Sequence, residues 1–308
     1  MFVLYHSADN PDRWLAAFSA IEPKLQLRVF PEVGNPADIV AAFVFNPPSG
    51  LLATLPNLKV ILSKGFGVDH LLKDPKLPRH VPVCRLFDPS AVSLMTQYVV
   101  HAVIHHHRSA PAFAAAKARG EWIRIPPPDT GETTVGVMGL GILGRDAAET
   151  FARLGFKVRG WSRSSKTIPG IECFHGAAGL PTFLSPCKFL VCLLALTPET
   201  TDILDRKTFA ALPRGAYVVN AARGNHLVDA DLLAAIDSGH IAGAALDVFR
   251  AEPLPRDHAF WTHPKIVLTP HVAADAITRT AAPLLVDNIR RALDGRPLIN
   301  QVDSVRGY

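Results

Sequence analysis

The chain has 308 residues, 48% of them hydrophobic, and a net charge of +5, so it can bury a sizeable core in one or two domains. Lysine and arginine are spread along the whole length, which argues against nucleic-acid binding because that function needs clustered cations. The four cysteines are scattered, and no apolar run is long enough to cross a bilayer. We expect a cytoplasmic protein that binds anions and no membrane.

The first part of the chain alternates short apolar runs with amphipathic patterns, as α/β domains do. Strands are predicted at 2–5, 25–30, 39–45 and 59–62, and a helix at 12–21. A long helix predicted at 90–108 then leads out of this region. Four strands before any nucleotide-binding motif are enough for a separate, smaller domain, which we expect to be flavodoxin-like.

The remainder of the chain continues the alternation and predicts a Rossmann-type doubly wound parallel sheet. Its strands are predicted at 134–138, 157–161, 189–193, 216–219, 243–246 and 266–268, and its helices at 142–154, 229–238 and 276–293. The last helix provides a route back to the first domain. We therefore expect a discontinuous substrate domain (1–90 and 275–308), a nucleotide-binding domain (91–274), and a cleft between them.

The segment VMGLGILG carries Gly139, Gly141 and Gly144 in G-x-G-x-x-G spacing, with a predicted strand before it and a helix after it. The first glycine makes a tight turn, the second lets a pyrophosphate approach, and the third permits close helix–strand packing. The helix start at Ile142 and Leu143 offers N–H groups to the phosphates. The alternative is an ordinary glycine turn.

The segment GWSRSSK stands where an NAD-binding protein usually carries an acid for the ribose hydroxyls. Here Ser162, Arg163 and Ser164 occupy that place. An arginine attracts a phosphate on the 2′-hydroxyl, so this segment favours NADP, with NADPH preferred and NAD as the weaker cofactor. The alternative is that Arg163 stacks on the adenine, which it could do with either cofactor.

Three ionisable residues each follow a predicted strand: Arg223, Glu252 and His271. Ligands bind outside the carboxyl ends of the strands in open α/β sheets, so these residues could converge. An arginine can hold a substrate carboxylate in its fork and polarise a carbonyl. A histidine can protonate the alkoxide while a carboxylate aligns the ring, which together suits keto-acid reduction. Three unrelated polar residues at loop starts are the alternative.

The segments VMGLGILG, NAARG, LDVFRAEPLP and TPHVAA, in this order, resemble the D-2-hydroxyacid dehydrogenase family over almost the whole chain. GWSRSSK and GFGVDHLL resemble its glyoxylate/hydroxypyruvate reductase A branch. The resemblance implies that Arg223 binds substrate, Glu252 pairs with the histidine, and His271 is the acid/base. It further implies a homodimer that reduces small 2-keto acids. Ala221 and Asp247, within these motifs, are placed among the cofactor-binding residues.

The segment SKGFGVDH resembles the family's substrate loop, whose backbone N–H groups hold the carboxylate. We assign Lys64, Gly65, Phe66 and Gly67 to this loop. Phe66 departs from the small residue of many relatives, which affects the shape of the expected pocket. Two aromatic residues, Phe45 and Trp261, are predicted to line the pocket as well, with core packing as the alternative for both.

Two other functions remain open at this point. One is a D-2-hydroxyacid dehydrogenase with a different substrate, and the other is a nicotinamide-sensing binding protein on the same fold. A metal site is not expected, although His101 and His105 are four residues apart on a predicted helix, because neither a carboxylate nor a cysteine stands at ligand spacing.

Overall fold

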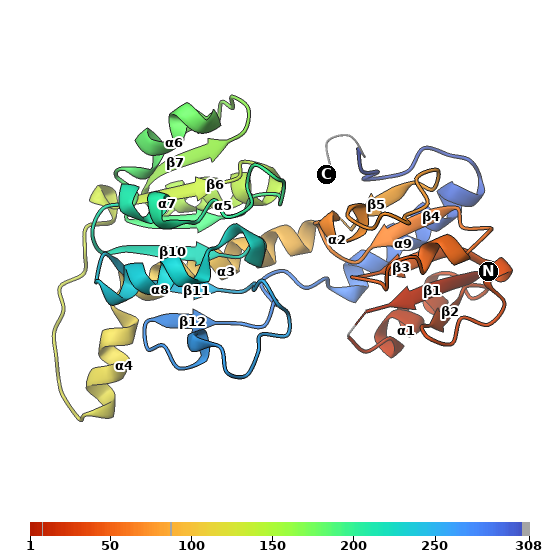
Figure 1. Ribbon diagram of the computed structural model, residues 1–308, viewed down its shortest axis with the longest axis horizontal. Helices are drawn as coiled ribbons and strands as arrows, with labels where there is room; N and C mark the ends of the chain where they lie inside the picture. The colour runs from red at the N-terminus through yellow and green to blue at the C-terminus, as the bar shows by residue number, and fades with distance from the viewer. Residues whose placement is uncertain (8, 87, 304–308) are drawn as a thin grey trace. The chain divides into compact units, whose positions relative to one another are not determined.

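The computed structural model describes residues 1–7, 9–86 and 88–303 and divides into two compact units (Figure 1). Unit 1 contains Met1–Ala91 and Asp275–Tyr308, and unit 2 contains Val92–Ala274. The chain leaves unit 1 within the long helix α3 (Pro89–His107) and returns to it after Ala274. None of the described helices is both long and apolar enough to cross a membrane.

Unit 1 is built on a five-stranded parallel sheet in the order β2-β1-β3-β4-β5, which is the flavodoxin-type order. The strands are β1 (Phe2–His6), β2 (Gln26–Val29), β3 (Ile39–Val44), β4 (Val60–Ser63) and β5 (Val83–Arg85). The helices are α1 (Asp12–Ile21), α2 (Asp69–Leu72) and α9 (Thr278–Leu293), with short 3₁₀ turns at Pro36–Asp38 and Leu52–Thr54.

Both faces of this sheet are covered, so its central strands are buried along almost their whole lengths and are mostly apolar rather than alternating. On one face, α1 and α9 pack over the sheet, and Trp14 of α1 meets Phe43 of β3 edge to face at 4.8 Å between ring centroids. Edge-to-face pairs of this kind stabilise cores beyond the area that they bury. This packing buries one face of the sheet against α1 and α9.

Unit 2 is built on a seven-stranded parallel sheet in the order β12-β11-β10-β9-β6-β7-β8, which contains the Rossmann order. Its strands are β6 (Thr134–Met138), β7 (Lys157–Ser162), β8 (Glu172–His175), β9 (Phe189–Cys192), β10 (Ala216–Asn220), β11 (Ile241–Leu246) and β12 (Ile266–Leu268). Its helices are α4 (Ala110–Ala118), α5 (Ile142–Arg153), α6 (Gly176–Leu184), α7 (Arg206–Ala211) and α8 (Asp229–Asp237), with 3₁₀ turns η3 (Thr130–Glu132), η4 (Gly224–His226) and η5 (Ala259–Trp261).

Alternate residues of these strands point to opposite faces and build two separate cores. Val137 of β6 lies in the core that α3 and α5 cover, whereas Met138 lies in the core beneath α6, α7 and α8. Because both faces are covered, β6, β9 and β10 are buried over their full lengths. The doubly wound fold class predicted from the sequence is confirmed, as is the flavodoxin-like order of the smaller sheet.

Several short elements were not predicted, namely β5, β8, α2, α4, α6 and α7. Strand β8 is an edge strand with the sequence ECFH, whose residues are exposed or half-buried, so it lacks the apolar run used to recognise a strand. Helix α6 contains Pro181 and two glycines, which are typical helix breakers, and tertiary packing of Phe183 and Leu184 overrides them. The last helix begins at Thr278, two residues later than predicted.

Candidate functional site

The predicted cofactor-binding and catalytic residues of unit 2 follow the carboxyl ends of its strands. Gly139 follows β6 and Arg163 follows β7, while Arg223, Glu252 and His271 follow β10, β11 and β12. All these strands are parallel, so their carboxyl ends lie along one edge of the sheet. The sheet reverses its strand order between β6 and β9, where ligands bind in folds of this kind.

The glycine loop has the geometry that a pyrophosphate site requires. Gly139 has φ of +98°, and a Cβ there would stand 2.5 Å from the Leu193 carbonyl oxygen. At Gly144, a Cβ would stand 1.7 Å from the Gly139 carbonyl oxygen, so the helix start and the strand end approach closely. Gly141 is exposed, and a Cβ there would meet nothing within 4 Å. The close contacts shape the turn, and the open space accommodates a ligand.

Helix α5 begins directly after this loop, with Gly141 as its N-cap. Glycine has no side chain with which to satisfy the N–H groups of the first turn, which include those of Ile142 and Leu143. The N–H groups and the partial positive charge of a helix N-terminus bind phosphate. The residues of this loop therefore fit a dinucleotide, as the sequence predicts.

The three predicted residues of the segment after β7 differ in their exposure to solvent. Ser162 is buried, and its hydroxyl donates to the Ser164 carbonyl oxygen at 2.8 Å, so it shapes the turn. Arg163 and Ser164 are exposed. The pKa of Glu199 is lowered by a hydrogen bond from Thr197 and also by the Arg163 cation. Arg163 thus projects near the loop that follows β9.

The imidazole of His271 is held by a carboxylate. His271 Nδ1 lies 2.7 Å from Glu252 Oε2, and Glu252 Oε1 accepts the Phe249 N–H at 2.9 Å. Burial alone would raise the pKa of Glu252, but hydrogen bonds from His271 and Phe249 lower it on balance. The Arg223 cation contributes to this lowering. The structure thus brings Arg223, Glu252 and His271 together, as predicted from their strand positions.

Asp247 holds the backbone loop that presents His271. Its carboxylate is buried and accepts from the Thr269 hydroxyl at 2.6 Å and from the N–H groups of Val272 and Ala273 at 2.9 Å. His271 has φ of +55°, a left-handed conformation, and its N–H donates to the Asp247 carbonyl oxygen at 2.8 Å. Burial raises the pKa of Asp247 despite these bonds. Its predicted contact with the cofactor stays a prediction.

The other predicted residues of unit 2 lie in two turns. Ala221 is buried directly after β10, and its N–H donates to the Cys192 carbonyl oxygen at 3.4 Å. Trp261 closes η5 and is 50% exposed, with its indole N–H donating to the Pro255 carbonyl oxygen at 2.8 Å. Core packing alone, the alternative for Trp261, does not explain a ring that is half exposed. Its contact with substrate stays a prediction.

In unit 1, the predicted substrate loop follows β4, and the hydroxyl of Ser63 at the end of that strand stabilises it. Ser63 Oγ accepts the Gly65 N–H at 3.3 Å and donates to the Gly67 carbonyl oxygen at 3.4 Å. The Phe45 ring lies beside this loop, 3.5 Å from the position of a Cβ on Gly65. Phe66 is half-buried. The structure places Phe45 against the loop, and its contact with substrate stays a prediction.

The comparisons with known proteins agree with this geometry. Residues 100–273 match the NAD binding domain of the D-isomer specific 2-hydroxyacid dehydrogenases. The chain belongs to this family. A glyoxylate/hydroxypyruvate reductase A from Serratia proteamaculans is 38% identical over 99% of both chains.

Two crystal structures from the family match the fold of the whole chain. A D-isomer specific 2-hydroxyacid dehydrogenase from Xanthobacter autotrophicus, in complex with NADPH and MES, is 44% identical with a TM-score of 0.93. An NADPH-dependent glyoxylate/hydroxypyruvate reductase from Sinorhizobium meliloti, in complex with NADP and sulfate, is 38% identical with the same TM-score. Both alignments cover 100% of this chain and 99% of the other. This member of the family is an NAD(P)-dependent oxidoreductase.

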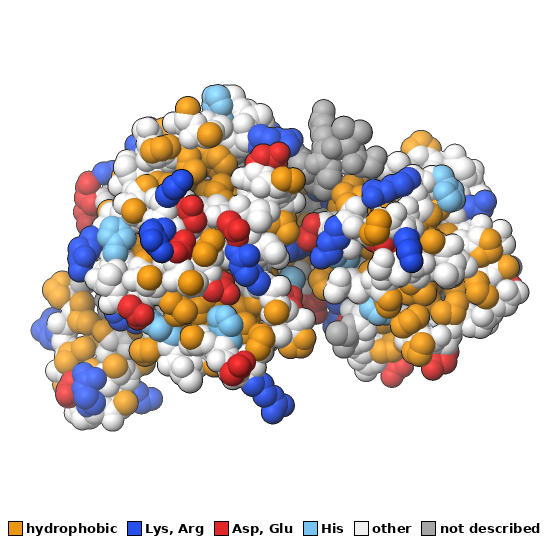
Figure 2. Space-filling model, viewed as in Figure 1, with side chains coloured by type: hydrophobic (Ala, Val, Ile, Leu, Met, Phe, Trp, Pro, Cys, Tyr) orange, Lys and Arg blue, Asp and Glu red, His pale blue; other side chains and the backbone are white. Residues whose placement is uncertain are grey.

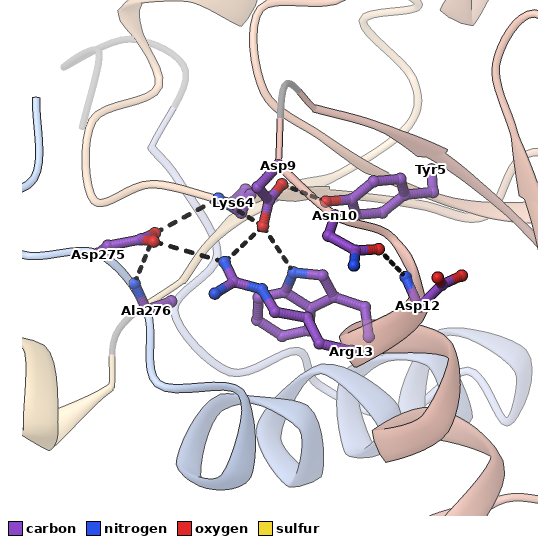
Figure 3. Close-up of polar contacts among 9 residues, drawn as sticks. Tyr5, Asp9, Asn10, Asp12, Arg13, Lys64, Asp275 and Ala276 are labelled. Carbon is purple, nitrogen blue, oxygen red and sulfur yellow. Dashed lines mark hydrogen bonds and ion pairs between the residues drawn. The ribbon is translucent and has the colours of Figure 1, made fainter. Parts of the chain in front are cut away.

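A cluster of charges that the sequence did not reveal surrounds Lys64 (Figure 3). The Lys64 ammonium lies 3.2 Å from Asp9 Oδ2 and 3.4 Å from Asp275 Oδ1, and Arg13 pairs with the same two carboxylates. The Lys64 side chain is only 11% exposed. Its charge is thus balanced within unit 1, and its predicted role as a substrate ligand stays a prediction.

Asp9 is the centre of this cluster. Its carboxylate accepts from the Tyr5 hydroxyl and from the Trp14 indole at 3.1 Å, in addition to the two cations. Burial raises its pKa, but the Tyr5 hydrogen bond and the Lys64 charge hold it well below 3.8 on balance. Asp9 and Asp275 are 266 positions apart in sequence, so only the fold reveals the cluster.

Within the described residues, no group of three histidine, cysteine or acidic side chains could hold a metal ion. The rings of His101 and His105, the predicted pair on α3, lie 5.5 Å apart. His106, the next residue on α3, turns inward and stacks on Tyr217 at 4.1 Å. Burial lowers the pKa of His106 to about 4, so its ring packs as a neutral aromatic side chain.

We predict that Asp9→Asn destabilises the protein by on the order of 1–3 kcal/mol at neutral pH, because it removes the charge that pairs with Lys64 and Arg13 and leaves one acceptor oxygen for the Tyr5 and Trp14 donors. The folded pKa of Asp9 is lowered, so its contribution is present above pH 3.8 and declines as the pH falls further. Urea unfolding midpoints of both proteins across this range measure the difference. Asp12→Asn, the same change on an exposed carboxylate, serves as the control. Equal midpoints for wild type and Asp9→Asn at neutral pH would contradict the prediction.

Proposed function

We propose that this protein is an NADPH-preferring reductase that converts small 2-keto acids, glyoxylate and hydroxypyruvate foremost, into 2-hydroxy acids. The observation that carries the proposal is the His271–Glu252 pair, 2.7 Å apart, with the Arg223 cation near it and the glycine loop on the same edge of the sheet. Relatives that carry this activity in their names match the whole chain.

The cofactor would be held at its phosphates by the N–H groups of Gly141, Ile142 and Leu143 and at its 2′-phosphate by Arg163. When bound, the reduced nicotinamide supplies the hydride. Ser164, exposed beside Arg163, can donate a further hydrogen bond to the phosphate. No acidic residue occupies 162–164, so nothing in that segment repels the additional charge.

In the proposed mechanism, the Arg223 guanidinium binds the substrate carboxylate and polarises the keto oxygen. His271 donates its Nε2 proton to the oxygen as that oxygen becomes an alkoxide, because Nδ1 is engaged by Glu252. The Glu252 carboxylate, with its lowered pKa, stays ionised and favours the imidazolium that must donate this proton.

We predict that His271→Gln lowers kcat with glyoxylate by about two to four orders of magnitude, the usual contribution of a positioned general acid. The KM for NADPH should change little, because the imidazole serves the substrate. Glu252→Gln should be milder, since it keeps one acceptor oxygen for the Phe249 N–H and loses the charge and the second acceptor beside the ring, while His271 itself remains. Steady-state kinetics at 340 nm measure all three proteins. Near-normal turnover by His271→Gln would remove this histidine from the mechanism.

We predict that Arg163→Ala abolishes most of the preference for NADPH over NADH. One charge-assisted hydrogen bond corresponds to about ten- to a hundredfold in kcat/KM. The loss should appear in the KM for NADPH, while the constants for NADH change much less. Arg153→Ala, which removes an exposed arginine at the opposite end of α5, is the matched control. Equal losses with both cofactors would favour adenine stacking instead.

We further propose that the protein forms a homodimer through α4 and the segment 119–128 that follows it. Trp122 is 95% exposed, and Phe113, Ile123 and Ile125 are exposed beside it. Figure 2 shows apolar side chains interspersed with charges over α4. The charges of Arg119 and Glu121 pair with each other, so they do not demand an acidic or basic partner. The same face of a second copy would cover the apolar side chains.

We predict that Trp122→Ser weakens this dimer by more than about thirtyfold in Kd, because buried tryptophans at interfaces commonly contribute 2 kcal/mol or more. Sedimentation velocity over a range of protein concentrations measures the change. Trp261→Ser is the control, since Trp261 is a half-exposed tryptophan outside the segment. A wild type that sediments as a monomer throughout, or a dimer unaffected by Trp122→Ser, would contradict the proposal.

We propose that the protein is cytoplasmic. The four cysteines, Cys84, Cys173, Cys187 and Cys192, all have free thiols. Burial raises the pKa of three of them, Cys84, Cys187 and Cys192, to about 12, so they are unreactive core residues. Reduced thiols of this kind suit a reducing compartment, and cell fractionation with an antibody to the protein would test the placement.

A further inference from the structure

His226 is a buried histidine that the sequence did not single out. It is the last residue of η4, three positions after Arg223, and its side chain is 0% exposed. Both nitrogens of a ring buried in this way must hydrogen-bond to protein groups, because an unpaired buried polar atom destabilises the fold. The partners of the two nitrogens therefore indicate what the residue does.

The ring links the ends of two neighbouring strands. Its Nδ1 lies 3.2 Å from the backbone nitrogen of Arg223, which follows β10. Its Nε2 lies 3.3 Å from the carbonyl oxygen of Ala195, which follows β9. Strands β9 and β10 are adjacent and parallel, so the imidazole spans two loops on the edge that carries the catalytic groups.

The partners assign the tautomer of His226. A carbonyl oxygen only accepts, so the contact with Ala195 requires a proton on Nε2. The Arg223 N–H only donates, so its contact requires Nδ1 without a proton. The Arg223 carbonyl oxygen also lies 3.2 Å from Nδ1, but it already accepts from the Asn220 side chain at 3.0 Å and from the His226 backbone N–H at 3.2 Å. The neutral ring protonated on Nε2 satisfies both the Arg223 N–H and the Ala195 carbonyl oxygen.

The backbone of Arg223 is thereby held at both of its polar groups. His226 accepts from its N–H, and Asn220, the last residue of β10, donates to its carbonyl oxygen. The following turn has no room to shift, because a Cβ on Gly224 would stand 1.9 Å from the Phe249 carbonyl carbon. A guanidinium fork binds a carboxylate in a defined plane, so the orientation of its backbone matters.

We propose that His226 is a positioning residue: as the neutral tautomer protonated on Nε2, it fixes the backbone of Arg223 and so aims the guanidinium at the substrate carboxylate. This inference rests on the proposed function, in which Arg223 binds that carboxylate. His226 touches neither substrate nor cofactor in this role. It acts on substrate binding only through the bond from Nδ1 to the Arg223 N–H.

Two variants separate this role from simple core packing. His226→Leu fills the space but removes the acceptor, whereas His226→Asn keeps an acceptor oxygen near the position of Nδ1. His226→Leu should raise the KM for glyoxylate and lower kcat/KM by roughly three- to tenfold, the scale of one neutral hydrogen bond. His226→Asn should recover most of this loss, and the KM for NADPH should stay unchanged in both.

His240→Leu is the matched control, because His240 also bonds a backbone carbonyl, that of Phe209 at 2.9 Å, but lies away from Arg223 in the chain. It should leave the glyoxylate KM unchanged. Equal losses in His226→Leu and His226→Asn would overturn the proposal, and so would a parallel rise in the KM for NADPH, since both indicate a general packing defect.

A measurement on the wild type keeps the test independent of turnover and of variant folding. Nitrogen-15 NMR of the His226 ring should show the proton on Nε2, and the Arg223 amide should exchange slowly with solvent. A proton on Nδ1, or a rapidly exchanging Arg223 amide, would overturn the proposal. If the wild type reduces no 2-keto acid, the proposed function fails, while the NMR result still decides whether His226 holds Arg223.

Discussion

The parallel alignment of the seven strands of unit 2 is the constraint on which its candidate site depends. In a parallel sheet every strand ends on the same edge, so residues from β6 to β12 reach one line of loops although they span more than a hundred positions. Both faces of the sheet are covered by helices, which leaves the strand ends as the place where polar side chains can gather. The glycine loop, Arg223, Glu252 and His271 all use this edge.

Buried polar residues at the strand ends fix the positions of the loops along this edge. Asn220 closes β10 and Asp247 follows β11 directly, and both are almost completely buried. In a dry interior a polar group must be satisfied, and here the neighbouring loops satisfy it: Asp247 takes three donors from the loop of His271, and Asn220 holds the turn of Arg223. These bonds hold His271 in a left-handed conformation that it would otherwise adopt only at a cost.

The cationic side chains of the two units differ in their surroundings. In unit 1 the Lys64 and Arg13 cations are balanced by Asp9 and Asp275, so the cluster is neutral as a whole and stabilises the loops after β1 and β4. In unit 2 the Arg163 side chain is exposed on a turn without acidic neighbours in sequence, and Arg223 lies near the carboxylate that also pairs with His271. A net charge of +5 is consistent with a protein whose proposed ligands are all anions.

The sequence by itself determined the central strands of the two sheets, the glycine loop and the segment at Arg163, because these follow from local periodicity and from the spacing of neighbouring residues; the edge strands β5 and β8 lack that periodicity. It also placed Arg223, Glu252 and His271 at strand ends, and the parallel sheet then brought them together. Only the tertiary structure showed which groups Lys64, Asp247 and His226 contact. The partners of Lys64 include Asp275, which is 211 positions away, and those of His226 include Ala195, 31 positions earlier, on the loop after a neighbouring strand. Such contacts leave no local pattern in a chain, since they exist only once the strands have paired and the loops have packed.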